Sequence, residues 1–313
     1  MEAPDTLQKA IVYFSDPERC FQYAFNLRWP NGVVSCPRCG SEEHSFIKTR
    51  RIWFCKGCKK QFTLKVGTVF EDSPLGLDKW MCAFWMLCNC KNGISSCEVA
   101  RAIGITQKSA WFMMHRIRKA MHEDSGVMLS GEIEADETFI GGKARNMHIS
   151  VRKRRITGSG PVDKTAVMGI LERGGQVRTK VVPSRKKKVL QAEVKKHVQA
   201  GAALYTDALK SYDGLEKHFV HQVVDHAVEY VNGRIHTNGL ENFWSLLKRG
   251  INGTYISIEP FHLFRYLDEQ SFRYNNRKNK DDQTRFETAM RNVFGKRLTY
   301  TELTGGTGSA TAQ

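Results

Sequence analysis

The sequence of 313 residues predicts a mixed α/β or α+β domain that follows a small cysteine-containing region and a helical region. Three observations support this fold class. The sequence up to about residue 66 is typical of short strands and turns and contains two C-x2-C pairs, helical periodicity dominates from about 77 to 123, and strand-like and helix-like segments alternate from about 132 to 294. We therefore expect regions at 1–70, 75–125 and 130–298, and a disordered tail at 305–313 because that segment is small and polar.

Composition supports a folded core and argues against a membrane protein. Apolar residues make up 41% of the sequence, which is enough to form a core. The first residues, MEAPDTLQKA, are polar and lack the apolar segment of a signal peptide, and no run of about 18 apolar residues occurs. We therefore expect a cytoplasmic protein without a transmembrane segment.

The positive charge points to a polyanionic partner. The sequence has 48 Lys and Arg against 32 Asp and Glu, a net charge of +16. Nucleic acid is the commonest partner of such a protein, although a ribosome-associated or merely cationic surface would have the same composition.

Most of this excess lies in one stretch. Between residues 141 and 200 there are 16 Lys and Arg but three acidic residues. Two basic runs stand out, at Arg152, Lys153, Arg154 and Arg155 and at Arg185, Lys186, Lys187 and Lys188. Because 146–161 also contains Gly and Ser, it resembles a mobile loop, which is either a solvated linker or a segment that grips phosphates. We favour phosphate binding, since the stretch falls between candidate catalytic acids.

Four of the nine cysteines form a metal-binding pattern. They are Cys36, Cys39, Cys55 and Cys58, in two C-x2-C pairs separated by 15 residues. A C-x2-C turn points both thiolates at one ion, and four thiolates satisfy tetrahedral zinc with no open position. Gly40 and Gly57 suit the tight turns. The sequence therefore predicts a structural zinc ribbon; the alternative is two unrelated turns with buried cysteines. The remaining cysteines are expected to be packing residues, namely Cys20, Cys82, Cys88, Cys90 and Cys97.

A pair of helices is predicted between residues 95 and 121, preceded by a helix at 77–90. Ser95 and Glu98 have the spacing of a capping box, Gly104 interrupts the pattern, and Thr106 can cap a second helix. Two helices joined by a short turn with Gly resemble a DNA-binding helix-turn-helix, and an ordinary helical hairpin is the alternative. The second helix is expected to present these residues outside the core: Gln107, Lys108, Trp111, Arg116 and Arg118.

Strand patterns place two acidic residues in the third region. Alternating residues at 133–139 predict a strand that carries Asp136, and the apolar run at 203–207 predicts a short buried strand that ends in Asp207. Further strands are expected at 165–171, 177–182 and 222–224, with a helix at 189–198. A strand end is a favourable place for a metal ligand at the edge of a sheet.

A third acidic residue lies on a predicted helix. Thr237 or Asn238 can cap a helix whose apolar stripe contains Phe243 and Trp244. Glu241 is expected beside this stripe in the first turn, partly shielded by it. Lys248 and Arg249 follow one to two turns later, where they can reach phosphates.

These segments resemble the ISXO-like family of insertion-sequence transposases. The matching stretches are CPRCG, CKGCKKQF, DETFIGGK, YTDALKSY, HTNGLENFWSLLKRGINGTY and YLDEQSFRYNNR, which span about residues 36–277. The resemblance implies a zinc ribbon, a helical segment and a ribonuclease H-like catalytic domain with a mixed sheet flanked by helices. It also implies a DDE triad of Asp136 on the first strand, Asp207 at the end of the fourth and Glu241 on the closing helix. Because some relatives use Asn or His as the third ligand, Asn238 and His236 stay open as alternatives.

The resemblance also implies a mechanism. Two Mg²⁺ ions, for which Mn²⁺ is a possible substitute, would support hydrolysis of a phosphodiester at the element's end and joining of the freed 3′ end to target DNA. The implied partners are terminal inverted repeats, target DNA and further copies of the chain, with a nucleoid-associated location. The alternatives are a zinc-ribbon DNA-binding regulator without catalysis and a related nuclease or resolvase.

Overall fold

The computed structural model describes residues 4–123, 126–142, 144–158, 160–224, 236–278 and 280–305. Its contacts define two compact units, one of Met1–His122 with Lys278–Gln313 and one of Glu123–Arg277. Most of the expected tail, residues 306–313, lies outside the described residues.

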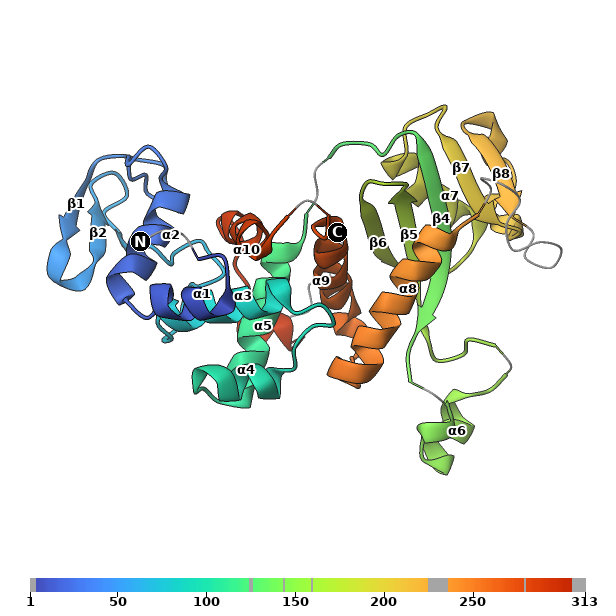
Figure 1. Cartoon of the computed structure of the whole chain (residues 1–313), viewed down its shortest axis with the longest axis horizontal. Helices are drawn as coiled ribbons and strands as arrows, with labels where there is room; N and C mark the ends of the chain where they lie inside the picture. The colour runs from blue at the N-terminus through green and yellow to red at the C-terminus, as the bar shows by residue number, and fades with distance from the viewer. Residues whose placement is uncertain are drawn as a thin grey trace. The chain divides into compact units, whose positions relative to one another are not determined.

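The first unit begins with two helices, α1 (Leu7–Phe14) and α2 (Pro17–Arg28) (Figure 1). The expectation of only short strands and turns before residue 66 was therefore wrong. Thr6 caps α1, and α2 starts with the capping side chain of Asp16 followed by Pro17, whose fixed φ suits a first helical position. The local capping signals thus outweighed the turn-like composition.

A three-stranded antiparallel sheet follows, in the order β1 (His44–Ile47), β2 (Ile52–Cys55), β3 (Gln61–Phe62). Trp53 is 3% exposed and stacks on Phe62, with ring centroids 5.7 Å apart, and on Phe21 of α2 at 6.1 Å. A sheet of this size buries few side chains by itself, and α2 completes the hydrophobic core by packing against Trp53.

The predicted helices α3 (Leu77–Asn89), α4 (Ser96–Ile103) and α5 (Gln107–Met121) are confirmed. Ser95 and Glu98 form the capping box, and Gly104 ends α4 in the left-handed region at φ 63°. The exposure expected for two side chains of α5 was wrong, because Arg116 and Arg118 are only 5% and 1% exposed. Arg116 instead donates to the backbone carbonyls of Leu298, Val69 and Glu71.

The last helices, α10 (Asp282–Arg291) and α11 (Tyr300–Leu303), belong to this same unit. Phe286 of α10 contacts the rings of Phe14 and Trp85. Of the cysteines expected to pack, Cys20 and Cys88 are buried, Cys82 and Cys90 are half-buried, and Cys97 is exposed, so that expectation was wrong for Cys97.

The second unit contains a five-stranded sheet in the order β6-β5-β4-β7-β8. Its strands are β4 (Glu132–Ile140), β5 (Thr165–Glu172), β6 (Val177–Val182), β7 (Ala203–Asp207) and β8 (Val220–Val224). The first three pair antiparallel as a meander, whereas β7 pairs in parallel with β4, and β8 in parallel with β7. This mixed sheet with flanking helices confirms the predicted fold class.

Helices cover both faces of this sheet (Figure 1). The helix α7 (Lys187–His197) contributes Leu190 and Val194 to a core cluster that also contains Ile133 and Ala135 of β4. On the other face, α8 (Asn238–Gly250) and α9 (Leu263–Asn275) bury an apolar cluster that includes Leu240, Phe243 and Leu267. Short helical turns at Lys210–Tyr212, Leu215–Lys217, Ile251–Tyr255 and Pro260–His262 complete the unit.

The connection from β4 to β5 contains a helix where a mobile loop was expected. It includes a 3-10 turn at Ala144–Asn146 and α6 (Ile149–Arg155), and Figure 1 shows α6 set away from the sheet. The run of Arg152 to Arg155 lies on α6, and all four side chains are exposed. Gly and Ser flank this run but do not interrupt it, so the helix can form. Within the described part of the chain, no helix has both the length and the apolar character to cross a membrane.

Candidate active site and metal centre

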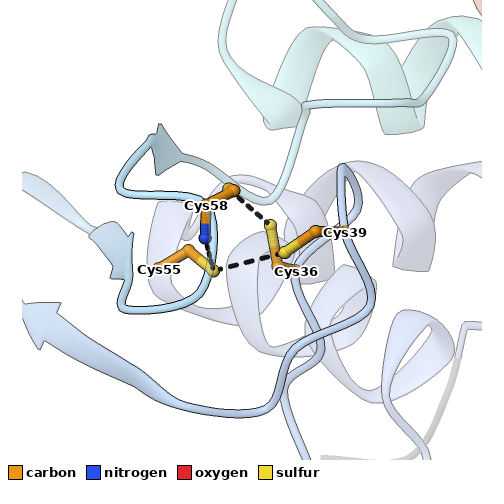
Figure 2. Close-up of side chains that lie close together, drawn as sticks. All are labelled: Cys36, Cys39, Cys55 and Cys58. Atoms are coloured by element: carbon orange, nitrogen blue, oxygen red, sulfur yellow. Dashed lines mark hydrogen bonds between the residues drawn. The ribbon is translucent and has the colours of Figure 1, made fainter.

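The four predicted zinc ligands converge in the first unit (Figure 2). Their sulfur atoms all lie within 4.8 Å of one another, with Cys36 to Cys58 at 3.8 Å and Cys39 to Cys55 at 3.5 Å. A tetrahedron of zinc–sulfur bonds about 2.3 Å long has edges of about 3.8 Å, so the thiols fit a zinc ion. They are the only group of three or more potential ligands this compact among the described residues.

Local backbone geometry forms the two cysteine turns. Gly40 has φ 74°, and a Cβ at Gly57 would lie 3.0 Å from that of Ser41. The backbone N–H of Cys58 donates to Sγ of Cys55 at 3.5 Å and lowers the pKa of this thiol to about 6. A thiol with a low pKa is readily available as the thiolate that zinc binds.

The sheet register places Asp136 and Asp207 side by side. Ala135 of β4 pairs with Thr206 of the parallel strand β7, and each acid is the next residue of its strand. Since residues paired in this way share a face, both carboxyl groups leave the sheet on the same side. The side chain of Asp207 also accepts from the backbone N–H of Leu209 at 3.2 Å, which orients it at the strand end.

The third acid comes from α8, which lies over this face. Nε1 of Trp244 donates to Oδ2 of Asp136 at 2.9 Å, and Glu241, one turn earlier, is close enough to raise the pKa of Asp136. The expected shielding of Glu241 was wrong: its side chain is exposed, because Phe243 and Trp244 turn into the sheet. The three carboxylates do not form a group as compact as the cysteines.

Two glycines let α8 approach the sheet. A Cβ at Gly169, which pairs with Asp136 in the sheet, would lie 2.6 Å from Cζ2 of Trp244. One at Gly239 would lie 2.5 Å from Leu171. Both distances are too short for a real contact, so the indole of Trp244 can reach Asp136 only while residue 169 is glycine.

Gly169→Ala is therefore expected to displace Trp244. The change should lower the free energy of unfolding by about 1–3 kcal/mol, as overpacking does, and should separate Glu241 from Asp136. Urea unfolding measures the loss. Gly253→Ala is the matched control, because a Cβ there has no atom within 4 Å. Equal stability of the two variants would contradict this packing account.

A buried ionic network holds the start of α8. Glu134, fully buried on β4, accepts from Nε of Arg173 at 2.8 Å and from the backbone N–H of Leu240 at 2.9 Å. Nη2 of Arg173 in turn donates to the carbonyl of His236 at 2.6 Å and to its Nδ1 at 3.1 Å. Thr237 occupies the N-cap position of α8, but its side chain makes no capping hydrogen bond. The carboxylate of Glu134 takes this role by accepting from a backbone N–H in the first turn of the helix.

The network also engages His236, one of the two alternatives for the third ligand. The imidazole of His236 faces Arg173 and Glu134, and Asn238 is exposed in the first turn of α8. Sequence reasoning missed the roles of Glu134 and Arg173. The available signal was that Glu134 lies two residues before Asp136 and thus shares its face of the strand.

Burial and like charge raise the pKa values of two acids here. Burial, opposed in part by the Trp244 hydrogen bond and assisted by Asp207 and Glu241, raises the pKa of Asp136 to about 6. Burial also raises the pKa of Glu137 to about 7, although this carboxyl accepts a hydrogen bond from the hydroxyl of Tyr212. A carboxylate crowded by other carboxylates is a favourable ligand for a hard divalent cation, which relieves the repulsion.

The raised pKa of Asp136 predicts a pH dependence of stability in metal-free protein. The folded state binds the proton of the Asp136 carboxyl group more tightly than the unfolded state does. The stabilisation of the fold by this proton is therefore fully present below about pH 4 and is lost as pH rises through 6. Asp136→Asn should remove this contribution. We expect the urea midpoint of the variant to exceed that of the wild type more at pH 7 than at pH 4. A constant difference would contradict the shift.

The predicted DNA-binding residues are exposed, and they lie on or directly before three helices, α6, α7 and α8. Arg152 to Arg155 lie on α6, Arg185 to Lys188 lead into α7, and Lys248 and Arg249 lie near the end of α8. Arg185 is near enough to Glu137 to lower the pKa of that acid. The second basic run therefore starts beside the carboxylates.

Comparisons with known proteins agree with this architecture. A family model described as the ISXO2-like transposase domain matches residues 128–275, and one described as the transposase zinc-ribbon domain matches residues 15–61. An uncharacterized protein in transposable element ISH50 of Halobacterium salinarum is 29% identical over 259 residues, covering 77% of this chain and 85% of that protein. An uncharacterized transposase-like protein of Haemophilus influenzae is 31% identical over 102 residues, covering 32% of this chain and 82% of that protein.

The fold and the four-cysteine centre thus define a transposase with an N-terminal zinc ribbon. The chain belongs to the ISXO2-like transposase family of insertion sequences.

Proposed function

We propose that the protein binds the ends of its insertion sequence and catalyses DNA cleavage and strand transfer through Asp136, Asp207 and Glu241. The observation that carries this proposal is the convergence of the three acids, which come from β4, β7 and α8, on one face of the sheet. A non-catalytic DNA-binding regulator would have no use for clustered, mutually repelling carboxylates at this position.

The donor set fits Mg²⁺, with Mn²⁺ as a possible substitute, since carboxylate oxygens are the ligands that hard cations prefer. A pair of such ions would activate the attacking water or 3′-hydroxyl and stabilise the leaving oxygen. The protein's own contribution is to hold the ligands: the strand pairing fixes Asp136 beside Asp207, and the indole of Trp244 orients the Asp136 carboxylate. Glu134 and Arg173 fix the start of α8, and so the position of Glu241.

DNA binding is assigned to three surfaces. The basic runs on α6 and before α7, with Lys248 and Arg249, would neutralise phosphates near the acids. The pair α4 and α5 presents exposed Gln107 and Lys108 and would act as a helix-turn-helix, and the zinc ribbon adds a rigid module. Pairing two element ends calls for a homo-oligomer.

The domain organisation that we propose follows these functions. It comprises a zinc-ribbon module within residues 1–70, a DNA-binding helical module within 75–125 and a catalytic domain that starts near residue 130. The catalytic acids and their supporting network all lie in the unit Glu123–Arg277.

The direct test uses the full-length protein with Mg²⁺ and duplexes that carry the element's terminal sequences. We expect cleavage at the element's end and joined products on a target plasmid, both visible on sequencing gels. Cleavage without any joined product would instead favour a nuclease or resolvase. DNA binding with neither reaction would favour a regulator.

A further inference from the structure

A groove opens where β4 ends, β5 begins and β6 leads into α7. Its lining comes from Phe139, from the segment 161–166 and from the segment 181–185. None of the functions assigned above uses Phe139 or Lys164, and both line the groove.

The groove combines a flat apolar wall with two cations. The guanidinium of Arg185 lies over the ring of Phe139, with 4.8 Å between its central carbon and the ring centroid. Lys164 and Arg185 are exposed, and within the described residues neither forms an ion pair with a carboxylate. Aromatic rings and guanidinium planes stack on nucleobases, and neighbouring cations bind phosphates, so this is the composition of a site for a single-stranded nucleotide.

The groove lies near the same end of β4 as the carboxylates, on the other face of the sheet. Phe139 is three residues beyond Asp136, roughly 10 Å along the strand, and it pairs with Ala166, which packs on the α7 side, whereas Asp136 faces α8. Arg185, on the groove side, is near enough to Glu137, the neighbour of Asp136, to lower its pKa. A DNA strand with one phosphodiester at the acids would therefore reach the groove by passing over the end of β4, within a few nucleotides.

The wall that carries Lys164 is held in place from two sides. A Cβ at Gly141 would lie 3.2 Å from the Cα of Lys164, so the chain after β4 packs directly against this wall. Asp163, at φ 63°, pairs with Arg155 of α6 at 3.6 Å. The groove is thus connected to the basic helix α6, and a strand bound along α6 would continue towards it.

We propose that this groove holds one unpaired nucleotide of the DNA strand that is processed at the carboxylates, with its base against Phe139 and Arg185 and its phosphate at Lys164. The inference rests on the proposed function, because it takes DNA as the substrate. It adds a preference for DNA with an unpaired nucleotide close to the reacting phosphate.

The test compares two duplexes of equal length, one blunt and one with a short single-stranded thymidine extension. Fluorescence anisotropy with the full-length protein at low salt measures both affinities. We expect wild type to bind the extended duplex about tenfold more tightly, within the range measured for one stacked base. Phe139→Leu should lose this preference while its affinity for the blunt duplex stays unchanged.

Two further variants and one modified DNA complete the design. Arg185→Lys keeps the charge but not the planar group, and should lose part of the preference. Phe261→Leu changes an exposed phenylalanine of the same unit that does not line the groove, and this variant should keep the preference for the extended duplex. An extension with abasic positions keeps the phosphates but not the base, and should bind wild type more weakly than the thymidine extension.

Equal affinity of wild type for both duplexes would overturn the inference. So would an equal loss for both duplexes in Phe139→Leu, or an undiminished preference for the abasic extension, which would indicate contacts to phosphates alone. If the preference is absent while strand joining proceeds, the groove assignment fails alone. If the preference is present without cleavage or joining, the catalytic proposal fails alone.

Discussion

Asp136→Asn should abolish Mg²⁺-dependent strand joining while DNA binding survives. Asparagine keeps the size of the side chain and can still accept from Nε1 of Trp244, so the fold is expected to persist. It removes the charge that would hold a cation, and the rate should fall by about a thousandfold or more, equivalent to about 4 kcal/mol of transition-state stabilisation. Asp207→Asn should have the same effect. Single-turnover joining assays measure the rate, and anisotropy measures binding.

The matched control is Asp213→Asn. Asp213 is an exposed acid in the turn that follows Asp207, and its side chain is not one of the proposed ligands. This variant should join DNA at the wild-type rate. Joining at a normal rate by Asp136→Asn or Asp207→Asn would remove the basis of the catalytic proposal.

The same assay can show whether Glu241 or Asn238 is the third metal ligand. Glu241→Gln should be as inactive as Asp136→Asn, whereas Asn238→Ala should keep most of the activity. The reason is that Glu241 carries a charge close enough to Asp136 to raise its pKa, whereas Asn238 offers a cation only a neutral amide oxygen. The reverse pattern would move the third ligand to Asn238.

Cys36→Ser should release the zinc and unfold the ribbon. Structural zinc contributes about 10 kcal/mol or more to the folding of small zinc modules, far more than a three-stranded sheet with one central tryptophan can replace. We expect less than one zinc per chain by atomic emission and faster proteolysis within residues 15–61. The second unit should keep its own melting transition, because it contains none of the four ligands.

Cys97→Ser provides the control, because Cys97 is exposed and lies apart from the cluster. It should retain a full complement of zinc and the protease resistance of the wild type. Wild-type protein purified without any bound metal would contradict the assignment of the ribbon.

Much of the fold could be predicted because local patterns and burial agree. The alternation at Glu132–Ile140, the apolar run that ends in Asp207 and the cap at Ser95 each determine one element, and each element was confirmed. The predicted zinc ligands lie together because their spacing is itself the geometric requirement. The catalytic triad stays a prediction that the structure makes physically reasonable.

What the sequence did not reveal depends on contacts between distant residues. Arg116 has the charge of a surface side chain, yet it is buried because three backbone carbonyls from residues 69, 71 and 298 surround it. Glu134 and Arg173 are 39 residues apart, and no local pattern pairs them. Gly169 looks like a weak point in a strand until the indole that packs on it is known.

The order β6-β5-β4-β7-β8 also determines when activity can first exist during synthesis. The meander of β4, β5 and β6 has only local pairings and can form early, whereas β7 must return to the far side of β4, and α8 emerges later still. A ribosome-bound chain that has exposed residues 1–200 therefore already carries its zinc ribbon and both basic runs, but only one of the three acids. On the proposed function, such a chain would contact DNA but could not cut it until the last third of the protein has been made.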